Sequence, residues 1–246
     1  MKTSCSTKVF QNLGAKNIFQ AIDIAVELGL DGINIDAREN ALLAIDNFSF
    51  LKSAEIARHA LKREMEIQAL SINEISADKS EVDRLNKAVS IAHSLACPLV
   101  TFSITGIDEE TGLVKQYDDL TNVLKQASKL AADFDICFAA EAAYDSITDS
   151  FEKALQLFVD VDEYNFGVAL NSISLKKELY NNVARDIELI GESLLLVNIS
   201  EWENCDNAFS ILKKNNYKNY ICLRNDDLNE KKEIINFVNL IKNYND

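Results

Sequence analysis

Short apolar runs rich in β-branched residues alternate along the whole chain with longer stretches of helical periodicity. After Asn17, for example, Ile18, Ala21 and Ile22 fall on one face of a helix, and Gly29 supplies a stop at its C-terminal end. The short runs that separate such stretches are nearly continuous in apolar residues, as buried parallel strands are. The pattern therefore predicts a repeated strand–helix unit.

Read in this way, the chain contains about eight such units, the number that a closed barrel of this type uses. We expect strands at residues 4–10, 31–36, 67–71, 99–104, 136–140, 166–170, 194–199 and 220–223. We expect helices at residues 18–28, 50–64, 82–92 (after a cap at Ser80), 120–132, 149–158, 183–190, 208–214 and 234–241.

The length of the chain decides between the two ways of arranging these units. A closed (β/α)8 barrel typically takes about 250 residues, and this chain has 246. No linker or break in composition divides it. We therefore predict a single TIM-barrel domain, residues 1–246, in preference to an open doubly wound sheet.

Composition narrows the possible partners. The formal net charge of −14 repels phosphate backbones and anionic lipid, so we expect neither nucleic acid nor a membrane as the main partner. The chain has seven glycines and one proline, too few for a turn-rich all-β fold. No glycine-rich phosphate-binding motif occurs.

The cysteines and the N-terminal sequence indicate a cytoplasmic protein. The five cysteines are scattered and form no CxxC pair, which favours reduced thiols over disulfides or a zinc site. The N-terminal sequence has no apolar signal-peptide core, and no run approaches the roughly 18 apolar residues of a membrane span. The oligomeric state stays open.

Candidate chemistry lies where each predicted strand ends, because the active sites of such barrels are built at the C-terminal ends of the strands. Any one of these polar residues could equally be a solvated loop residue. The candidates are Asp36, Arg38, Asn73, Glu74, Ser103, Thr105, Glu141, Asn171, Ser174, Asn198, Glu201, Trp202, Arg224, Asn225 and Asp226.

Glu141 is the strongest of these candidates. It ends an apolar strand and precedes two alanines, and a carboxylate in such surroundings must be paired, ligated or protonated. The alternative is a structural ion pair with Arg224 or Arg38. Arg224 could neutralise Glu141 or hold an anion, and Trp202 could stack on a sugar or serve only for packing.

The two histidines, His59 and His93, both fall within predicted helices. A helix position in the outer ring of a barrel lies away from the strand ends. We therefore expect neither histidine in the site.

Several segments, in order, resemble the xylose isomerase-like barrel family, which includes sugar-phosphate isomerases, epimerases and metal-dependent AP endonucleases. The segments are 25–35 (AVELGLDGINI), 67–71 (IQALS), 100–103 (VTFS) and the strand ending at Glu141. The resemblance covers essentially the whole chain and implies a TIM barrel. It also implies a sugar or sugar phosphate as the small-molecule partner.

Members of that family usually bind a divalent metal through Glu, Asp, His and Glu at successive strand ends. The resemblance places the first ligand on Glu141, but it places the others on Asn171, Asn198 and Arg224. Ser174 stands at a further family histidine, Asn34 at an early glutamate, and Glu201 near a lost acid. A guanidinium cannot ligate a metal, so we expect no cofactor, unless Glu141 and Glu201 suffice for a metal.

Three functions follow, of which we favour the first. In an isomerase or epimerase for a small polyhydroxy carbonyl compound, Glu141 and Glu201 would transfer the proton, and the substrate would be bound by Asn73, Asn171, Asn198, Trp202 and Arg224. The second is an inactive family member that serves as a binding or scaffold protein. An AP endonuclease is disfavoured, because it needs histidine-bound zinc and an approach to DNA.

Overall fold

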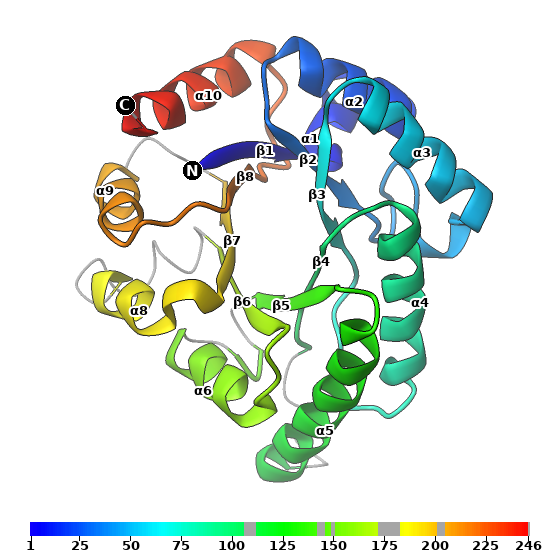
Figure 1. The fold of residues 1–246 in the computed structure, drawn as a ribbon, viewed down its shortest axis with the longest axis vertical. Helices are drawn as coiled ribbons and strands as arrows, with labels where there is room; N and C mark the ends of the chain where they lie inside the picture. Colours follow the sequence, from blue (N-terminus) through cyan, green and yellow to red (C-terminus); the bar gives the residue numbers. More distant parts are fainter. Residues whose placement is uncertain (106–111, 142–145, 149–150, 172–182, 201–204, 246) are drawn as a thin grey trace.

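Eight parallel strands close into a barrel in chain order, with helices around the outside (Figure 1). The computed structural model describes residues 1–105, 112–141, 146–148, 151–171, 183–200 and 205–245. Within these residues each strand pairs with its neighbours in sequence, and β1 pairs with β8 to complete the ring. The predicted (β/α)8 TIM barrel is confirmed.

The strands are short and almost fully buried, because helices cover their outer face and the barrel encloses the inner one. They are β1 Lys2–Ser6, β2 Gly32–Asp36, β3 Glu66–Ser71, β4 Leu99–Ser103, β5 Cys137–Glu141, β6 Phe166–Asn171, β7 Leu194–Ile199 and β8 Tyr220–Leu223. The register shifts by one residue after Ile33 in β2 and after Val168 in β6.

The described helices follow the strands and carry apolar stripes toward the sheet. They are α1 Thr7–Asn12, α2 Ile18–Glu27, α3 Phe50–Lys62, α4 Glu81–Ser94, α5 Leu113–Ala132, α6 Phe151–Val161, α8 Val183–Ile190, α9 Asp206–Lys214 and α10 Lys231–Asn245, with short 3-10 turns at Ile45–Asn47 and Gly191–Ser193. None of them is long and apolar enough to cross a membrane.

The first strand differs from its prediction at residues 4–10. β1 ends at Ser6, and α1 begins at once because the Ser6 hydroxyl accepts a hydrogen bond from the Lys8 amide at 3.3 Å. Val9 and Phe10 are fully buried, but they belong to helix α1 and not to a strand. A short apolar run does not distinguish these two structures by itself.

Helix starts were predicted with mixed success. Asn17 caps α2 as expected, accepting from the Gln20 amide at 3.0 Å. α4 begins at Glu81, but the Ser80 side chain makes no capping hydrogen bond. α5 starts at Leu113, a full two turns before the predicted residue 120.

Small residues fill the middle of the barrel. The large apolar cluster lies between the sheet and the helices, whereas a separate cluster occupies the interior. The interior cluster consists of Ala69, Leu99, Ala139, Ala169, Leu196 and Cys222. Polar side chains lie on the same strands next to it, toward the C-terminal ends, and they form the candidate site.

Candidate functional site

An ion pair joins the ends of β5 and β8. Glu141 is the last residue of β5, and Arg224 directly follows β8. Arg224 Nη1 lies 2.7 Å from each carboxylate oxygen of Glu141. Asn198 on β7 donates from Nδ2 to Glu141 Oε1 at 3.3 Å. Three residues that the sequence nominated therefore meet at one point.

This ion pair is largely shielded from water. The side chain of Glu141 is 5% exposed and that of Arg224 is 16% exposed. A buried carboxylate is tolerated only when charge and hydrogen bonds compensate it, and Arg224 and Asn198 do so here. Of the two ion pairs considered for Glu141 from the sequence, the structure shows the one with Arg224.

A second ion pair follows β2. Arg38 Nε lies 2.9 Å and 3.1 Å from the two oxygens of Asp36, and Arg38 Nη2 also donates to the carboxylate. The Asp36 amide donates to the Thr7 hydroxyl at 2.8 Å, which anchors the strand end to α1. Arg38 therefore pairs with Asp36, its neighbour in sequence, and not with Glu141.

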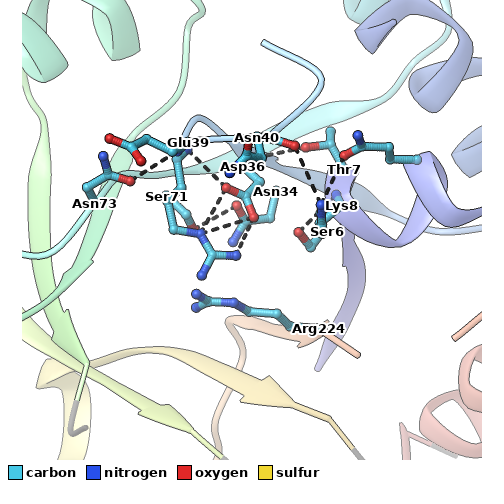
Figure 2. Close-up of polar contacts among 12 residues, drawn as sticks. Ser6, Thr7, Lys8, Asn34, Asp36, Glu39, Asn40, Ser71, Asn73 and Arg224 are labelled. Carbon is cyan, nitrogen blue, oxygen red and sulfur yellow. Dashed lines mark hydrogen bonds and ion pairs between the residues drawn. The ribbon is translucent and has the colours of Figure 1, made fainter. Parts of the chain in front are cut away.

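The two ion pairs act on each other. Burial opposes ionisation of Asp36, but hydrogen bonds and charge from Arg38, with a contribution from Arg224, outweigh it and lower the pKa of the carboxyl. The hydrogen bond to Asp36 raises the pKa of Arg38 despite burial, and Glu141 and Asp226 add to the effect. We call Asp36, Arg38, Glu141 and Arg224 the charge quartet. In Figure 2 the Arg224 side chain lies below the group of residues that contains Asp36 and Asn34.

Polar side chains from the three adjacent strands β2, β3 and β4 are linked by hydrogen bonds inside the barrel. The Ser71 hydroxyl donates to Asn34 Oδ1 at 3.0 Å and lies 2.8 Å from the Thr101 hydroxyl. All three residues are at most 3% exposed. Cys222 lies among these groups: burial raises the pKa of its thiol to about 12, although Ser4, Arg224 and Asn34 favour the thiolate.

The remaining predicted site residues fall into two groups. Asn73 lies in the loop after β3, where its Oδ1 accepts a hydrogen bond from the Glu39 amide at 3.2 Å (Figure 2). Asn171 is the last residue of β6 and pairs in register with Asn198 of β7. Ser174, Glu201 and Trp202 lie outside the described residues. Their predicted roles stay predictions.

Both histidines lie on the outer ring, as predicted. His59 on α3 pairs with Asp23 at 2.9 Å and packs edge-on against Phe19. His93 on α4 packs against Phe134. Neither side chain is part of the strand-end site.

Sequence reasoning missed the interior roles of Ser71 and Thr101. Both are small polar residues, each two positions beyond an interior apolar residue, Ala69 or Leu99. Side chains two apart in a strand share a face. That spacing was the available signal that both hydroxyls enter the barrel.

The described residues do not fit a divalent metal. Over these residues, no group of three or more histidine, cysteine, aspartate or glutamate side chains converges. The one carboxylate at the expected position, Glu141, has both oxygens on Arg224. A guanidinium has donors only and repels a cation.

A closed ring of eight parallel strands surrounded by helices, with a charged cluster at the C-terminal ends of the strands, defines a TIM-barrel protein. The chain belongs to the xylose isomerase-like TIM-barrel family, whose model matches residues 22–204. The family resemblance inferred from the sequence is thereby confirmed. A search of curated proteins finds no match.

Solved structures share the whole fold at low sequence identity. A D-psicose 3-epimerase, crystallised with D-fructose, superposes with a TM-score of 0.82 at 12% identity and covers 99% of this chain and 98% of its own. A 3-keto-D-glucoside 4-epimerase from E. coli gives 0.82 at 12%, covering 99% of both chains. A probable 3-DHS dehydratase from Bacillus anthracis gives 0.80 at 14%, covering 98% of this chain and 99% of its own.

Proposed function

We propose that the protein binds a small polyhydroxylated carbonyl compound, a sugar or sugar phosphate, at the C-terminal end of the barrel and isomerises or epimerises it without a divalent metal. The observation that carries this proposal is the contact of Arg224 with both oxygens of Glu141. The family resemblance places a metal ligand at Arg224, and its guanidinium would supply positive charge beside the carboxylate in place of a metal ion.

The chemistry requires a base and a positive group. Glu141 would remove the proton from the carbon next to the carbonyl, and N–H groups of Arg224 would stabilise the oxyanion that develops. One oxygen of Glu141 must leave Arg224 for this to occur. Glu201, the predicted second acid, would return the proton.

Hydroxyl groups of the ligand have a partner in Asn198. Its Nδ2 is bound to Glu141, whereas among the described residues no donor reaches its buried Oδ1. A buried acceptor without a partner is unfavourable. A ligand hydroxyl that reaches Asn198 would supply the missing hydrogen bond, and Asn73, Asn171 and Trp202 are the further substrate contacts that we propose.

The same ion pair supports a second candidate, a binding protein without turnover. Arg224 engages both oxygens of Glu141, and in this candidate the carboxylate would serve as a structural partner of Arg224 and not as a base. In this case the barrel would retain the ligand but transfer no proton.

Proton exchange distinguishes the two candidates. We would incubate the protein with aldoses and ketoses in D2O, with a metal chelator present, and follow by NMR the deuterium that enters next to the carbonyl. We expect exchange in the wild type and a loss of about a hundredfold or more in Glu141→Gln. Glu66→Gln is the matched control, because Glu66 forms its ion pair with Lys2 at the N-terminal end of the barrel.

Each outcome decides something. Equal exchange in Glu141→Gln and the wild type would refute Glu141 as the base. Sugar binding in calorimetry without any exchange would establish the binding protein. Activity that appears only when a metal is added would refute the metal-free mechanism.

A further inference from the structure

The charge quartet is asymmetric in its exposure to solvent. The carboxylates of Asp36 and Glu141 are 2% and 5% exposed, whereas their partners Arg38 and Arg224 are 30% and 16% exposed. The two carboxylates are buried, whereas the two guanidinium groups are partly exposed to solvent. A molecule that approaches this end of the barrel therefore meets N–H donors before it meets carboxylate oxygens.

Each arginine uses only part of its fork in its ion pair. Arg224 reaches Glu141 through Nη1, and Arg38 reaches Asp36 through Nε and Nη2. Nη2 and Nε of Arg224 and Nη1 of Arg38 therefore lie outside both ion pairs. Within the part of the chain that the structure describes, no acceptor engages these three atoms, and two guanidinium edges of this kind match the oxygens of a carboxylate or phosphate.

The two ion pairs also lie within electrostatic reach of each other. The charge of Arg224 helps to lower the pKa of Asp36, the partner of Arg38. The charge of Glu141 helps to raise the pKa of Arg38. Figure 2 shows the Arg224 side chain below the group of residues that contains Asp36. Each guanidinium is already paired with a carboxylate, so an anionic ligand would be held by charge-assisted hydrogen bonds from the N–H groups that lie outside these pairs.

We propose that Arg38 and Arg224 together bind an anionic oxygen group of the ligand, so that the substrate class is a sugar acid or a sugar phosphate and not a neutral sugar. This inference rests on the proposed function and makes it more specific. Asp226 is the opposing group in the surroundings: it is exposed and its charge acts on Arg38.

Calorimetric titration with five probes tests the inference: D-gluconate, D-glucose 6-phosphate, neutral D-fructose, acetate and inorganic phosphate. We expect one of the two charged sugars to bind the wild type about tenfold or more tightly than fructose. A hydrogen bond between charged groups contributes enough binding free energy for about a tenfold gain in affinity. The better of the two identifies the anionic group as carboxylate or phosphate.

Three variants locate the effect. Arg38→Gln should lose about tenfold in affinity for the charged sugar and leave fructose unchanged. Arg58→Gln removes an exposed charge on the outer face of α3 and should stay within about twofold of the wild type. Asp226→Asn removes the opposing charge and should strengthen the charged sugar by about twofold to threefold.

Folding is controlled separately, because Arg38→Gln leaves Asp36 buried without its partner. If circular dichroism shows that this variant is unfolded, the double variant Asp36→Asn with Arg38→Gln removes both charges. The double variant should show the same selective loss of the charged sugar.

Every other result is also decisive. Equal binding of fructose and the charged sugars, unaffected by Arg38→Gln, would overturn this inference and leave the proposed function intact. Acetate or phosphate binding as tightly as the charged sugars would support the anion site and refute the sugar as its ligand. Absence of binding by all five probes would overturn both proposals.

Discussion

Arg224 follows Glu141 by 83 residues in the sequence, yet its Nη1 lies 2.7 Å from both carboxylate oxygens. Glu141 ends β5 and Arg224 follows β8, and these two strands are not neighbours in the barrel. The ion pair therefore spans the opening of the barrel. It turns an otherwise unfavourable buried carboxylate into a fixed element of the site.

Removing Arg224 should destabilise the fold. In Arg224→Gln the carboxylate of Glu141 stays buried without a counter-charge, and breaking such a pair costs about 3–5 kcal/mol. Urea unfolding measures the loss. In the double variant with Glu141→Gln, the loss should be smaller than the sum of the two single losses. Strict additivity would show that the two side chains do not interact in solution.

Acid should weaken the fold partly through Asp36. Its pKa in the folded protein lies below the ordinary 3.8, so the ion pair with Arg38 stabilises the fold above that value, and the contribution is lost as pH falls through the lowered pKa. Unfolding free energies measured between about pH 5 and pH 2 should decline less steeply in Asp36→Asn than in the wild type.

The control for this pH dependence is Glu55→Gln, which removes an exposed carboxylate from α3. This variant should keep the steep acid decline of the wild type. If Asp36→Asn declines as steeply as the control, the stabilising ion pair with Arg38 does not form.

Gly167 in β6 has no room for a side chain. A Cβ there would lie 2.6 Å from the backbone oxygen of Ser193, so Gly167→Ala should destabilise the fold by about 1–3 kcal/mol. Gly32→Ala is the comparison, because its Cβ would meet only the ring of Tyr220 at 2.7 Å, which can move. Thermal unfolding should show the larger loss at Gly167, and an equal loss at both sites would contradict the argument.

The cysteines should differ in their reactivity with iodoacetamide. Cys5, Cys97 and Cys222 are buried, and burial raises the pKa of Cys97 and Cys222 to about 12. Cys137 and Cys205 are only partly buried. Mass spectrometry of the folded protein should therefore find label first on Cys137 and Cys205. Early labelling of Cys222 would mean that the interior of the barrel opens.

Local patterns were sufficient for the architecture. Apolar periodicity predicted the strands and helices, and the chain length favoured a closed barrel, because each signal depends on residues close in sequence. Errors arose where a local pattern was ambiguous, as at Val9 and Phe10, which a capping hydrogen bond at Ser6 places in a helix.

The candidate site was only partly accessible from the sequence. The rule that barrel sites lie at strand ends nominated Glu141, Asn198 and Arg224, and these residues do meet. The sequence left open whether Arg38 or Arg224 pairs with Glu141. It also gave no reason to join Ser71 to Asn34 and Thr101, which come from three different strands.

By itself, then, the sequence determined a (β/α)8 barrel with a polar end and its family, and the resemblance to that family predicted Arg224 at the place of a metal ligand. Only the tertiary structure decided that Arg224 pairs with Glu141, that Arg38 pairs with Asp36, and that the two acids are buried while the two arginines are partly exposed. The physical reason is that secondary structure follows from neighbours in the chain. Ion pairs across a barrel depend on its closure and register, which bring distant residues together.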